Sequence, residues 1–224
     1  RRSVELDQVS PYVLKGTVDT EDKRFYQHNG VDPQGILRAV VGQLSGRSEQ
    51  GGGSSITQQL VRNTILSDEQ FEMSLKRKVR EAYISIQMEK MYTKDQILNM
   101  YVNTIYYGNG AYGIEAASVT YFNKHASELT IAEAATLVGL PNSPTLYDPF
   151  RNPENCVSRR NLVLDRMLEA GDISQEEHDA ATAEELVLNH GELTDSTGSY
   201  PYFTDYVKQL LQQNFSSDTI LQGG

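Results

Sequence analysis

The sequence predicts a mainly α-helical protein, and three observations support this prediction. Apolar residues recur every three or four positions along most of the chain, whereas strict alternation of apolar and polar residues is hard to find. Ser, Thr, Asp or Pro stands at the start of many periodic stretches, as is typical of helix N-termini. Glycine or proline follows several of them, where helices commonly end. The expected helices cover residues 11–19, 33–44, 56–65, 72–91, 94–105, 114–122, 131–140, 153–170, 175–182 and 201–215.

Two of these helices carry clear apolar faces. The apolar side of helix 33–44 consists of Ile36, Leu37, Val40, Val41 and Leu44. In the long helix 72–91 we expect a buried stripe made of Leu75, Val79, Ala82, Ile86 and Met91. Composition predicts a glycine-rich flexible loop at 45–53, a Gly/Tyr-rich turn at 106–113, a proline-containing extended loop at 140–149 and a polar linker at 186–200.

The formal net charge of −10 is confined to the C-terminal part of the chain. Residues 1–167 contain 19 basic and 19 acidic residues, whereas residues 168–224 contain one basic residue, Lys208, and 11 acidic ones. The main body is therefore neutral on average and need not repel anionic substrates.

The sequence is compatible with more than one cellular compartment. The single cysteine, Cys156, excludes an internal disulfide, which is compatible with the cytoplasm or with a cell surface that does not rely on disulfides. No signal peptide and no run of 18 apolar residues is found. Because the chain starts abruptly with Arg1 and Arg2, we expect that a membrane anchor has been removed from it.

The first candidate for chemistry is the acidic pair Glu21 and Asp22, near the C-terminal end of the first expected helix. The helix dipole is negative at that end, so each acidic charge there costs on the order of 0.3–1 kcal/mol. A carboxylate in this position suits a general base that must accept a proton. The alternative interpretation is a solvated turn, which is the common case for an isolated acidic pair.

The second candidate is a basic cluster around Arg77, Lys78 and Glu81. Both cations lie on the same helix face as Glu81, four and three residues before it. One interpretation is an exposed face with surface ion pairs worth ~0–1 kcal/mol each. The other is a phosphate or pyrophosphate clamp, in which Glu81 orients the cations or holds a divalent metal, Mg²⁺ or Mn²⁺.

The third candidate is the glycine-rich stretch 51–53, which precedes a helix capped by Ser54 or Ser55. The unpaired N–H groups at such a helix start can bind an anion, although the Lys-Ser/Thr of a P-loop is missing. The alternative is a plain flexible loop. The amides of Gln58 and Gln59 suit sugar hydroxyls or N-acetyl groups.

The histidines do not indicate a metal site. His28, His125, His178 and His190 are far apart and lack metal-ligand spacing. We interpret His28, beside the acidic pair, as structural.

Taken together, the motifs resemble the peptidoglycan glycosyltransferase domain of class A penicillin-binding proteins and their monofunctional relatives, glycosyltransferase family 51. Five stretches carry the resemblance, in the family's order: Glu21-Asp22-x-x-Phe25-x-x-His28-x-Gly30, Gly53-Ser54-Ser55-Ile56-Thr57-Gln58-Gln59, Arg77-Lys78-x-x-Glu81, Lys94-x-x-Ile97-Leu98-x-x-Tyr101-x-Asn103 and Arg159-Arg160-x-x-Val163-Leu164. Three positions depart from the family pattern. Ser55 replaces the usual Thr, Arg62 replaces a common Lys, and Met73 stands where many members have an Arg.

The resemblance implies a lysozyme-like large lobe and a smaller, mobile, membrane-facing jaw lobe. We expect a glycosyltransferase domain over residues 1–185, with the small lobe at about 32–75, and a linker over 186–224 toward an absent transpeptidase domain. The apolar helix from Ile36 to Leu44 is the surface we expect to dip into lipid. The implied location is the extracytoplasmic face of a bacterial cell membrane.

The resemblance also implies the reaction. Enzymes of this family polymerise lipid II into β-1,4-linked glycan strands and release undecaprenyl pyrophosphate, with inversion at the anomeric carbon. Glu21 would be the general base, and Glu81 would orient the cations that neutralise the leaving group. The residues expected to bind the substrate are Asp22, Phe25, Ser54, Ser55, Gln58, Gln59, Arg62, Arg77, Lys78, Lys94 and Asn103. The expected partners are lipid II, the growing glycan chain, the membrane surface and the inhibitor moenomycin, with no nucleic acid and no organic cofactor.

Two rival functions remain at this point. A lysozyme-like muramidase or lytic transglycosylase is also mostly helical with a catalytic Glu, but it needs no pyrophosphate clamp such as Arg77, Lys78 and Glu81. An inactive scaffold or wall-binding module would have no need for the intact pair Glu21 and Glu81.

Overall fold

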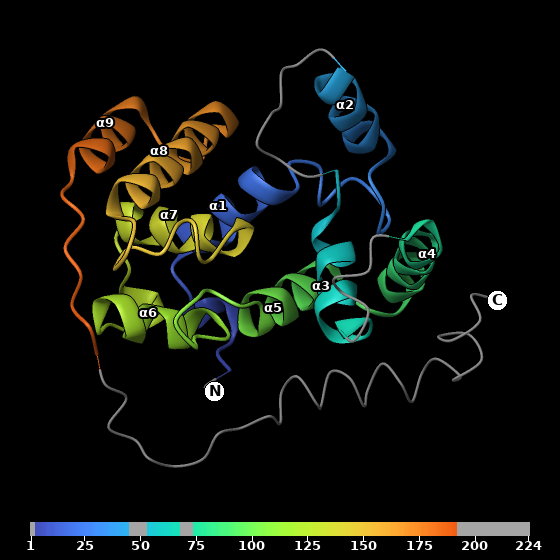
Figure 1. Ribbon diagram of the computed structural model, residues 1–224, viewed down its shortest axis with the longest axis horizontal. Coiled ribbons are helices and arrows are strands. Elements are labelled where there is room, and N and C mark those ends of the chain that lie inside the picture. The colour runs from blue at the N-terminus through green and yellow to red at the C-terminus, as the bar shows by residue number, and fades with distance from the viewer. Residues whose placement is uncertain (1–2, 45–52, 68–73, 192–224) are drawn as a thin grey trace. The chain divides into compact units, whose positions relative to one another are not determined.

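The computed structural model describes residues 3–44, 53–67 and 74–191 of the chain (Figure 1). The helices in these ranges are η1 (Leu6–Gln8), α1 (Pro11–Glu21), α2 (Pro33–Leu44), α3 (Ile56–Thr64), α4 (Leu75–Met91), α5 (Lys94–Thr104), α6 (Ile114–Phe122), η3 (Ala126–Glu128), α7 (Ile131–Gly139), η4 (Leu140–Asn142), α8 (Pro153–Ala170) and α9 (Gln175–Ala183). Strand-like pairing in the described ranges amounts to one isolated bridge between Tyr106 and Tyr112. The mainly α expectation is confirmed.

The capping residues explain why most helices start where the sequence predicts. Ser55, Thr130 and Ser174 each accept a hydrogen bond from a backbone N–H in the first turn of α3, α7 and α9. The long helix differs from its expected start at residue 72. Ser74 is extended and accepts a bond from the N–H of Arg77, so α4 begins at Leu75. The helix expected at 201–215 and the departure at Met73 lie outside the described residues.

The described residues form two compact units, one of residues 3–20 and 102–191 and the other of residues 21–101. In the first unit α7 packs along α8, and α8 packs against α9 (Figure 1). Helix α7 is buried on nearly all sides and rich in alanine, which lets its neighbours approach closely. A Cβ added to Gly16 of α1 would lie 3.1 Å from the sulfur of Met167, so α1 also packs tightly against α8.

The first unit also fixes the backbone just before Glu21. Arg166 of α8 donates from Nη1 to the carbonyl oxygen of Thr20, at 2.8 Å. A cation is favourable at this position because it satisfies one of the last carbonyl groups of α1 and complements the helix dipole.

In the second unit α3 packs against α4 around Ile56, Leu60, Val61, Ile84 and Met88. The start of α3 is held by Gly30, whose φ of +95° favours glycine. A Cβ on Gly30 would lie 2.6 Å from the carbonyl oxygen of Ser85, so the chain approaches α4 there more closely than any other residue allows.

The expected orientation of α4 is wrong. Four of the five residues predicted to form its buried stripe lie on the outside instead: Leu75 is 82% exposed and Val79 is 61% exposed, and Ile86 and Met91 are exposed as well. Ala82 is half-buried. The buried residues are Arg77, Arg80, Glu81, Ile84, Ser85 and Met88. The polar face can be buried because its charges neutralise one another, as described below.

The apolar side of α2 is also exposed, with Leu37 at 64%, together with Ile36, Val40 and Val41. None of the helices in the described ranges combines the length and the apolar character needed to cross a membrane. The extent of a small lobe at 32–75 stays a prediction.

The segment after α9 is extended and lies along the end of α6. The N–H groups of Asn189 and Gly191 donate to the carbonyl oxygens of Tyr121 and Val119. The first residues of the expected polar linker are therefore anchored to the first unit, whereas residues 192–224 lie outside the described part of the chain.

Candidate active site

The proposed base, Glu21, is the last residue of α1 and is partly exposed. Its Oε2 accepts a hydrogen bond from Nε2 of Gln59, at 2.9 Å. The Oε1 of Gln59 in turn accepts a bond from the hydroxyl of Tyr101, at 3.1 Å. The Gln59 amide, which cannot rotate without losing one of these bonds, therefore orients the carboxylate of Glu21.

Glu81 lies at the centre of a cluster of cations on α3 and α4. Its side chain is 0% exposed. Arg77 Nη1 donates to Oε2 at 2.8 Å and Lys78 Nζ donates to Oε1 at 2.5 Å, and Arg62 Nη1 lies 4.0 Å from Oε2. Gln58 completes the set with an Nε2 bond to Oε1 of 3.3 Å. The sequence prediction that Arg77 and Lys78 share a face with Glu81 is confirmed.

The cations of this cluster differ in how far they reach solvent. The side chain of Arg77 is buried, whereas Lys78 is 40% exposed and Arg62 is 28% exposed. Lys78 also donates to Oγ of Ser54 at 2.8 Å, which ties α4 to the residue before the N-cap of α3. Lys78 and Arg62 can therefore reach an anion outside the cluster while Glu81 holds their position.

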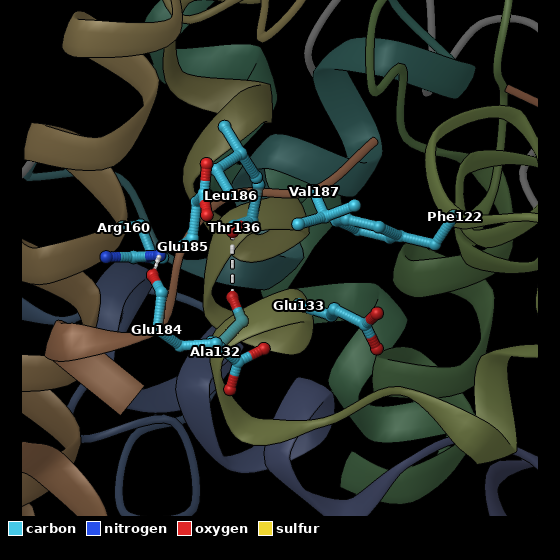
Figure 2. Close-up of a pocket in the computed structure, with 9 residues that line it drawn as sticks. All are labelled: Phe122, Ala132, Glu133, Thr136, Arg160, Glu184, Glu185, Leu186 and Val187. Carbon is cyan, nitrogen blue, oxygen red and sulfur yellow. Dashed lines mark hydrogen bonds between the residues drawn. The ribbon is translucent and has the colours of Figure 1, made fainter. Parts of the chain in front are cut away.

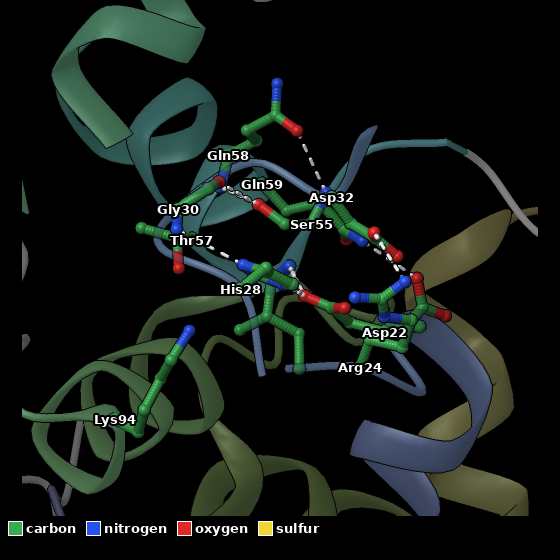
Figure 3. A network of polar contacts seen from close by, with 12 residues as sticks. Asp22, Arg24, His28, Gly30, Asp32, Ser55, Thr57, Gln58, Gln59 and Lys94 are labelled. Carbon is green, nitrogen blue, oxygen red and sulfur yellow. Dashed lines mark hydrogen bonds and ion pairs between the residues drawn. The ribbon is translucent and has the colours of Figure 1, made fainter. Parts of the chain in front are cut away.

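The residues of the first motif hold the start of α3 (Figure 3). Asp22 Oδ2 accepts bonds from His28 Nε2, at 2.8 Å, and from the N–H of Ile56, at 3.0 Å. The N–H of Gly30 donates to Nδ1 of His28, so the ring proton lies on Nε2. Ser55 donates from Oγ to the carbonyl oxygen of Gly30, at 2.5 Å.

Because Asp22 and His28 are buried, this arrangement confirms His28 as structural and gives Asp22 a structural task. Ser55, and not Ser54, is the N-cap of α3, and it forms a capping box with Gln58. The predicted substrate contacts of Asp22, Ser55 and Gln58 stay predictions.

Phe25 and Lys94 contact each other in the same unit. Phe25 is 0% exposed, and Lys94 Nζ lies 4.5 Å from the centre of its ring. The ammonium nitrogen of Lys94 is buried and lies 2.6 Å from Oε2 of Glu89. The expected contacts of both residues with substrate stay predictions.

Asn103 belongs to the other compact unit. Its Oδ1 accepts from the N–H of Val4 and its Nδ2 donates to the carbonyl oxygen of the same residue, both at 2.9 Å. The described contacts of Asn103 thus anchor the N-terminal segment, and its role in substrate binding stays a prediction.

The surroundings of Glu81 do not suit a metal ion. Both of its oxygens already bind cationic side chains, which would repel Mg²⁺ or Mn²⁺. Within residues 3–44, 53–67 and 74–191, no group of three or more His, Cys, Asp or Glu side chains could hold one.

A cavity of about 250 Å³ in the first unit contains none of the predicted site residues (Figure 2). It is lined by Phe122, Ala132, Glu133, Thr136, Arg160, Glu184, Glu185, Leu186 and Val187. The guanidinium of Arg160 is bound to the carbonyl oxygens of Glu184 and Thr182. Arg160 therefore stabilises the C-terminal end of α9.

Cys156 does not provide a nucleophile. It is 1% exposed, and burial raises the pKa of its thiol to about 12. The reactive thiolate is therefore scarce at neutral pH.

Glu89 also belongs to this region, although no motif or spacing in the sequence indicates it. Its side chain is 5% exposed, and it accepts a bond of 2.6 Å from the hydroxyl of Thr57. Glu89 lies near the end of α4, and Lys94 is the first residue of α5. Because they are on different helices, the charge spacing typical of ion pairs on one helix could not identify them as a pair.

A helical fold with a glutamine-oriented carboxylate and a carboxylate-bound cation cluster is consistent with an enzyme that transfers glycosyl groups. The chain belongs to the transglycosylase family, which matches residues 1–168. The family assignment made from the motifs is therefore confirmed.

The relatives are penicillin-binding proteins. The chain is 41% identical over its whole length to penicillin-binding protein 1A of Escherichia coli (strain K12), and 44% identical over 93% of its length to penicillin-binding protein 1A of Aquifex aeolicus (strain VF5). It covers 26% and 28% of these two proteins, so it spans about a quarter of their length.

The crystal structure of penicillin-binding protein 1A from Haemophilus influenzae matches 98% of this chain and 22% of that chain, with a TM-score of 0.52 and 25% sequence identity. The expected mainly α, lysozyme-like fold class is confirmed by this likeness, whereas the jaw lobe stays a prediction.

Proposed function

We propose that this chain is a peptidoglycan glycosyltransferase that polymerises lipid II. One observation carries the proposal: adjacent residues of α3 hold the two glutamates, Gln59 binding Glu21 and Gln58 binding Glu81. A partly exposed carboxylate and a cluster of cations are thus oriented by one short helix. This combination suits a reaction that needs a base and an anion-binding site at the same time.

In the proposed reaction the 4-hydroxyl of a GlcNAc attacks the anomeric carbon of the MurNAc at the reducing end of the growing chain. Glu21 takes the hydroxyl proton as the new C–O bond forms, and positioned bases contribute roughly 10²–10⁴-fold to such rates. The bond from the anomeric carbon to the pyrophosphate oxygen breaks, and the electron pair leaves with the pyrophosphate. Inversion then gives the β-1,4 linkage.

The leaving group needs charge neutralisation more than it needs a proton. Lys78 and Arg62, the more exposed members of the cluster, would bind the pyrophosphate, and Arg77 would add a fixed positive charge. Glu81 would hold these cations in place. Because both oxygens of Glu81 already bind cations, it is poorly suited to be the second carboxylic acid that a muramidase uses.

The substrate carries a lipid, so the enzyme would work at a membrane surface. The exposed apolar residues of α2 support this part of the proposal, because large exposed apolar surfaces mark interaction sites. We place the protein at the extracytoplasmic face of a bacterial membrane. A transpeptidase domain in the full-length protein, and inhibition by moenomycin, belong to the same proposal.

Incubation of the full chain with lipid II, followed by gel separation of glycan chains, tests the proposal. Polymer should form with the wild type, and the rate should be roughly 10²–10⁴-fold lower with Glu21→Gln. Glu154→Gln, an exposed glutamate of the first turn of α8, is the matched control and should retain activity. Cleavage of finished cell wall in place of polymer formation would favour the muramidase alternative.

A further inference from the structure

Four consecutive residues at the start of α3 each bind a different acidic side chain. The contacts are Ile56 N to Asp22 Oδ2 (3.0 Å), Thr57 Oγ1 to Glu89 Oε1 (2.6 Å), Gln58 Nε2 to Glu81 Oε1 (3.3 Å) and Gln59 Nε2 to Glu21 Oε2 (2.9 Å). Two of the acids, Glu21 and Glu81, belong to the proposed catalytic machinery, and a third, Asp22, accepts the N–H of the first residue of the helix. Glu89 lies outside all five motifs, and no function has yet been assigned to it.

Glu89 is held more firmly than a surface glutamate. Oε2 lies 2.6 Å from the ammonium of Lys94, and Oε1 accepts the Thr57 hydroxyl, so both oxygens are occupied. The nearby His28 Nδ1 lies 4.0 Å from Oε1 and accepts the N–H of Gly30. A buried carboxylate is stable only when it is paired, and Lys94 is its charge partner in the described structure.

The position of Thr57 links this ion pair to the site. The next two residues along the chain are Gln58 and Gln59, whose amides bind Glu81 and Glu21. A rotation of α3 about its axis would move both amides together. The bond between Thr57 and Glu89 opposes such a rotation, because it joins the buried Thr57 to the end of α4.

We infer that Glu89, with Lys94 as its charge partner, is a positioning residue that acts through Thr57 to set the orientation of α3. Its effect is to keep Glu21 and the cations around Glu81 in their relative places. Lys94 then serves this pair and not the pyrophosphate. The inference rests on the proposed function for its kinetic consequence, although the geometry can be tested without it.

The sharpest variant is Thr57→Val, which removes the hydroxyl and preserves shape and the ion pair. Thr64→Val is the matched control: Thr64 is a fully buried residue of the same helix, and its hydroxyl binds only the carbonyl oxygen of Leu60 among the described contacts. The initial rate of lipid II polymerisation should fall on the order of 10–100-fold in Thr57→Val, because small displacements of catalytic groups have large effects. The lipid II concentration for half-maximal rate should change little.

Thr57→Ser keeps the hydroxyl and should restore most of the rate. Glu89→Gln should lower the rate as well, and its melting temperature should fall because the charge of Lys94 is left buried without a partner. Equal losses in Thr57→Val and Thr64→Val would show that the hydroxyl contributes only stability. A wild-type rate in Thr57→Val would overturn the inference.

A second measurement separates this inference from the proposed function. NMR spectra of protein labelled at the glutamine side chains report directly on the amides of Gln58 and Gln59. Their hydrogen exchange should become faster in Thr57→Val and stay unchanged in Thr64→Val. If the wild type makes no polymer, the proposed function is wrong, and the exchange data still decide the inference; unchanged exchange in Thr57→Val contradicts it.

Discussion

Arg77 and Lys78 show how neighbouring cations on one carboxylate can contribute to different properties. Both bind Glu81, but Arg77 is buried and Lys78 is 40% exposed. Removing Arg77 leaves the buried Glu81 without its buried charge partner, whereas water can partly replace the more exposed Lys78, as it does in exposed ion pairs. The two residues should therefore separate stability from substrate binding.

Arg77→Ala should lower the free energy of unfolding by about 3–5 kcal/mol. Lys78→Ala should lower it by only about 0–1 kcal/mol, but it should raise the lipid II concentration needed for half-maximal rate. Urea denaturation and polymerisation rates measure the two effects. Similar losses of stability in both variants would contradict the role assigned to burial.

At the scale of elements, the side chain of Ser55, the N-cap of α3, forms two hydrogen bonds with different functions. Ser55 accepts from the N–H of Gln58 and donates to the carbonyl oxygen of Gly30. Ser174 caps α9 in the same way, and no second bond of its hydroxyl is described. Ser55→Ala should lower the free energy of unfolding by about 2 kcal/mol and Ser174→Ala by about 1 kcal/mol, measured by urea denaturation. An equal cost in both variants would show that the bond to Gly30 contributes nothing.

The contact between α8 and α9 should depend on pH. His178 binds Asp179 and Asp165 through its two ring nitrogens, and these hydrogen bonds raise the pKa of His178 above its usual value. Its contribution to stability is therefore complete below the unfolded pKa and is lost as the pH rises through the higher folded pKa. His178→Gln should lower the melting temperature more at about pH 6 than at about pH 9.

His190→Gln is the control, because the described bond of that imidazole is to the carbonyl oxygen of Thr120 and not to a carboxylate. Its effect on the melting temperature should be similar at both pH values. A loss for His178→Gln that grows with pH would contradict the assignment.

The sequence predicted the helices well because caps and periodicity are local signals. The side chains of Ser55, Thr130 and Ser174 each accept a hydrogen bond from the backbone N–H three residues later. Such short-range caps can be identified from the sequence. The orientation of α4 could not be predicted in this way. The usual rule places every apolar residue inward, but here the buried face of α4 combines Arg77 and Glu81 with Ile84 and Met88. Leu75 and Val79 face outward.

The sequence indicates which residues belong to the candidate site. It does not indicate which of them bind one another. The motifs identify Glu21, Glu81 and the two glutamines, but which glutamine binds which glutamate depends on how α3 packs against α4. The task of Glu89 depends on a contact across 32 residues. Such contacts follow from tertiary packing, which leaves no local signal in the sequence.

At the scale of the whole molecule, exposed apolar residues on α2 and α4 should bind a lipid surface. Burying a Leu or Val side chain contributes about 1.5–3 kcal/mol, so Leu75→Ser/Val79→Ser should weaken binding to vesicles by at least about tenfold. Sedimentation with phospholipid vesicles measures this. Leu146→Ser/Val187→Ser, which changes exposed apolar residues of the other unit, is the control and should bind as the wild type does. Equal weakening in both variants would contradict a specific membrane face.

The central claim is that Glu21 removes a proton from a sugar hydroxyl while the cations held by Glu81 bind the departing pyrophosphate. The most direct measurement is the rate at which lipid II is converted into glycan chains by the wild type, Glu21→Gln and Glu154→Gln. We predict polymer with the wild type and with Glu154→Gln, and a rate lower by roughly 10²–10⁴-fold with Glu21→Gln. Polymer formation by Glu21→Gln at the wild-type rate would contradict the account.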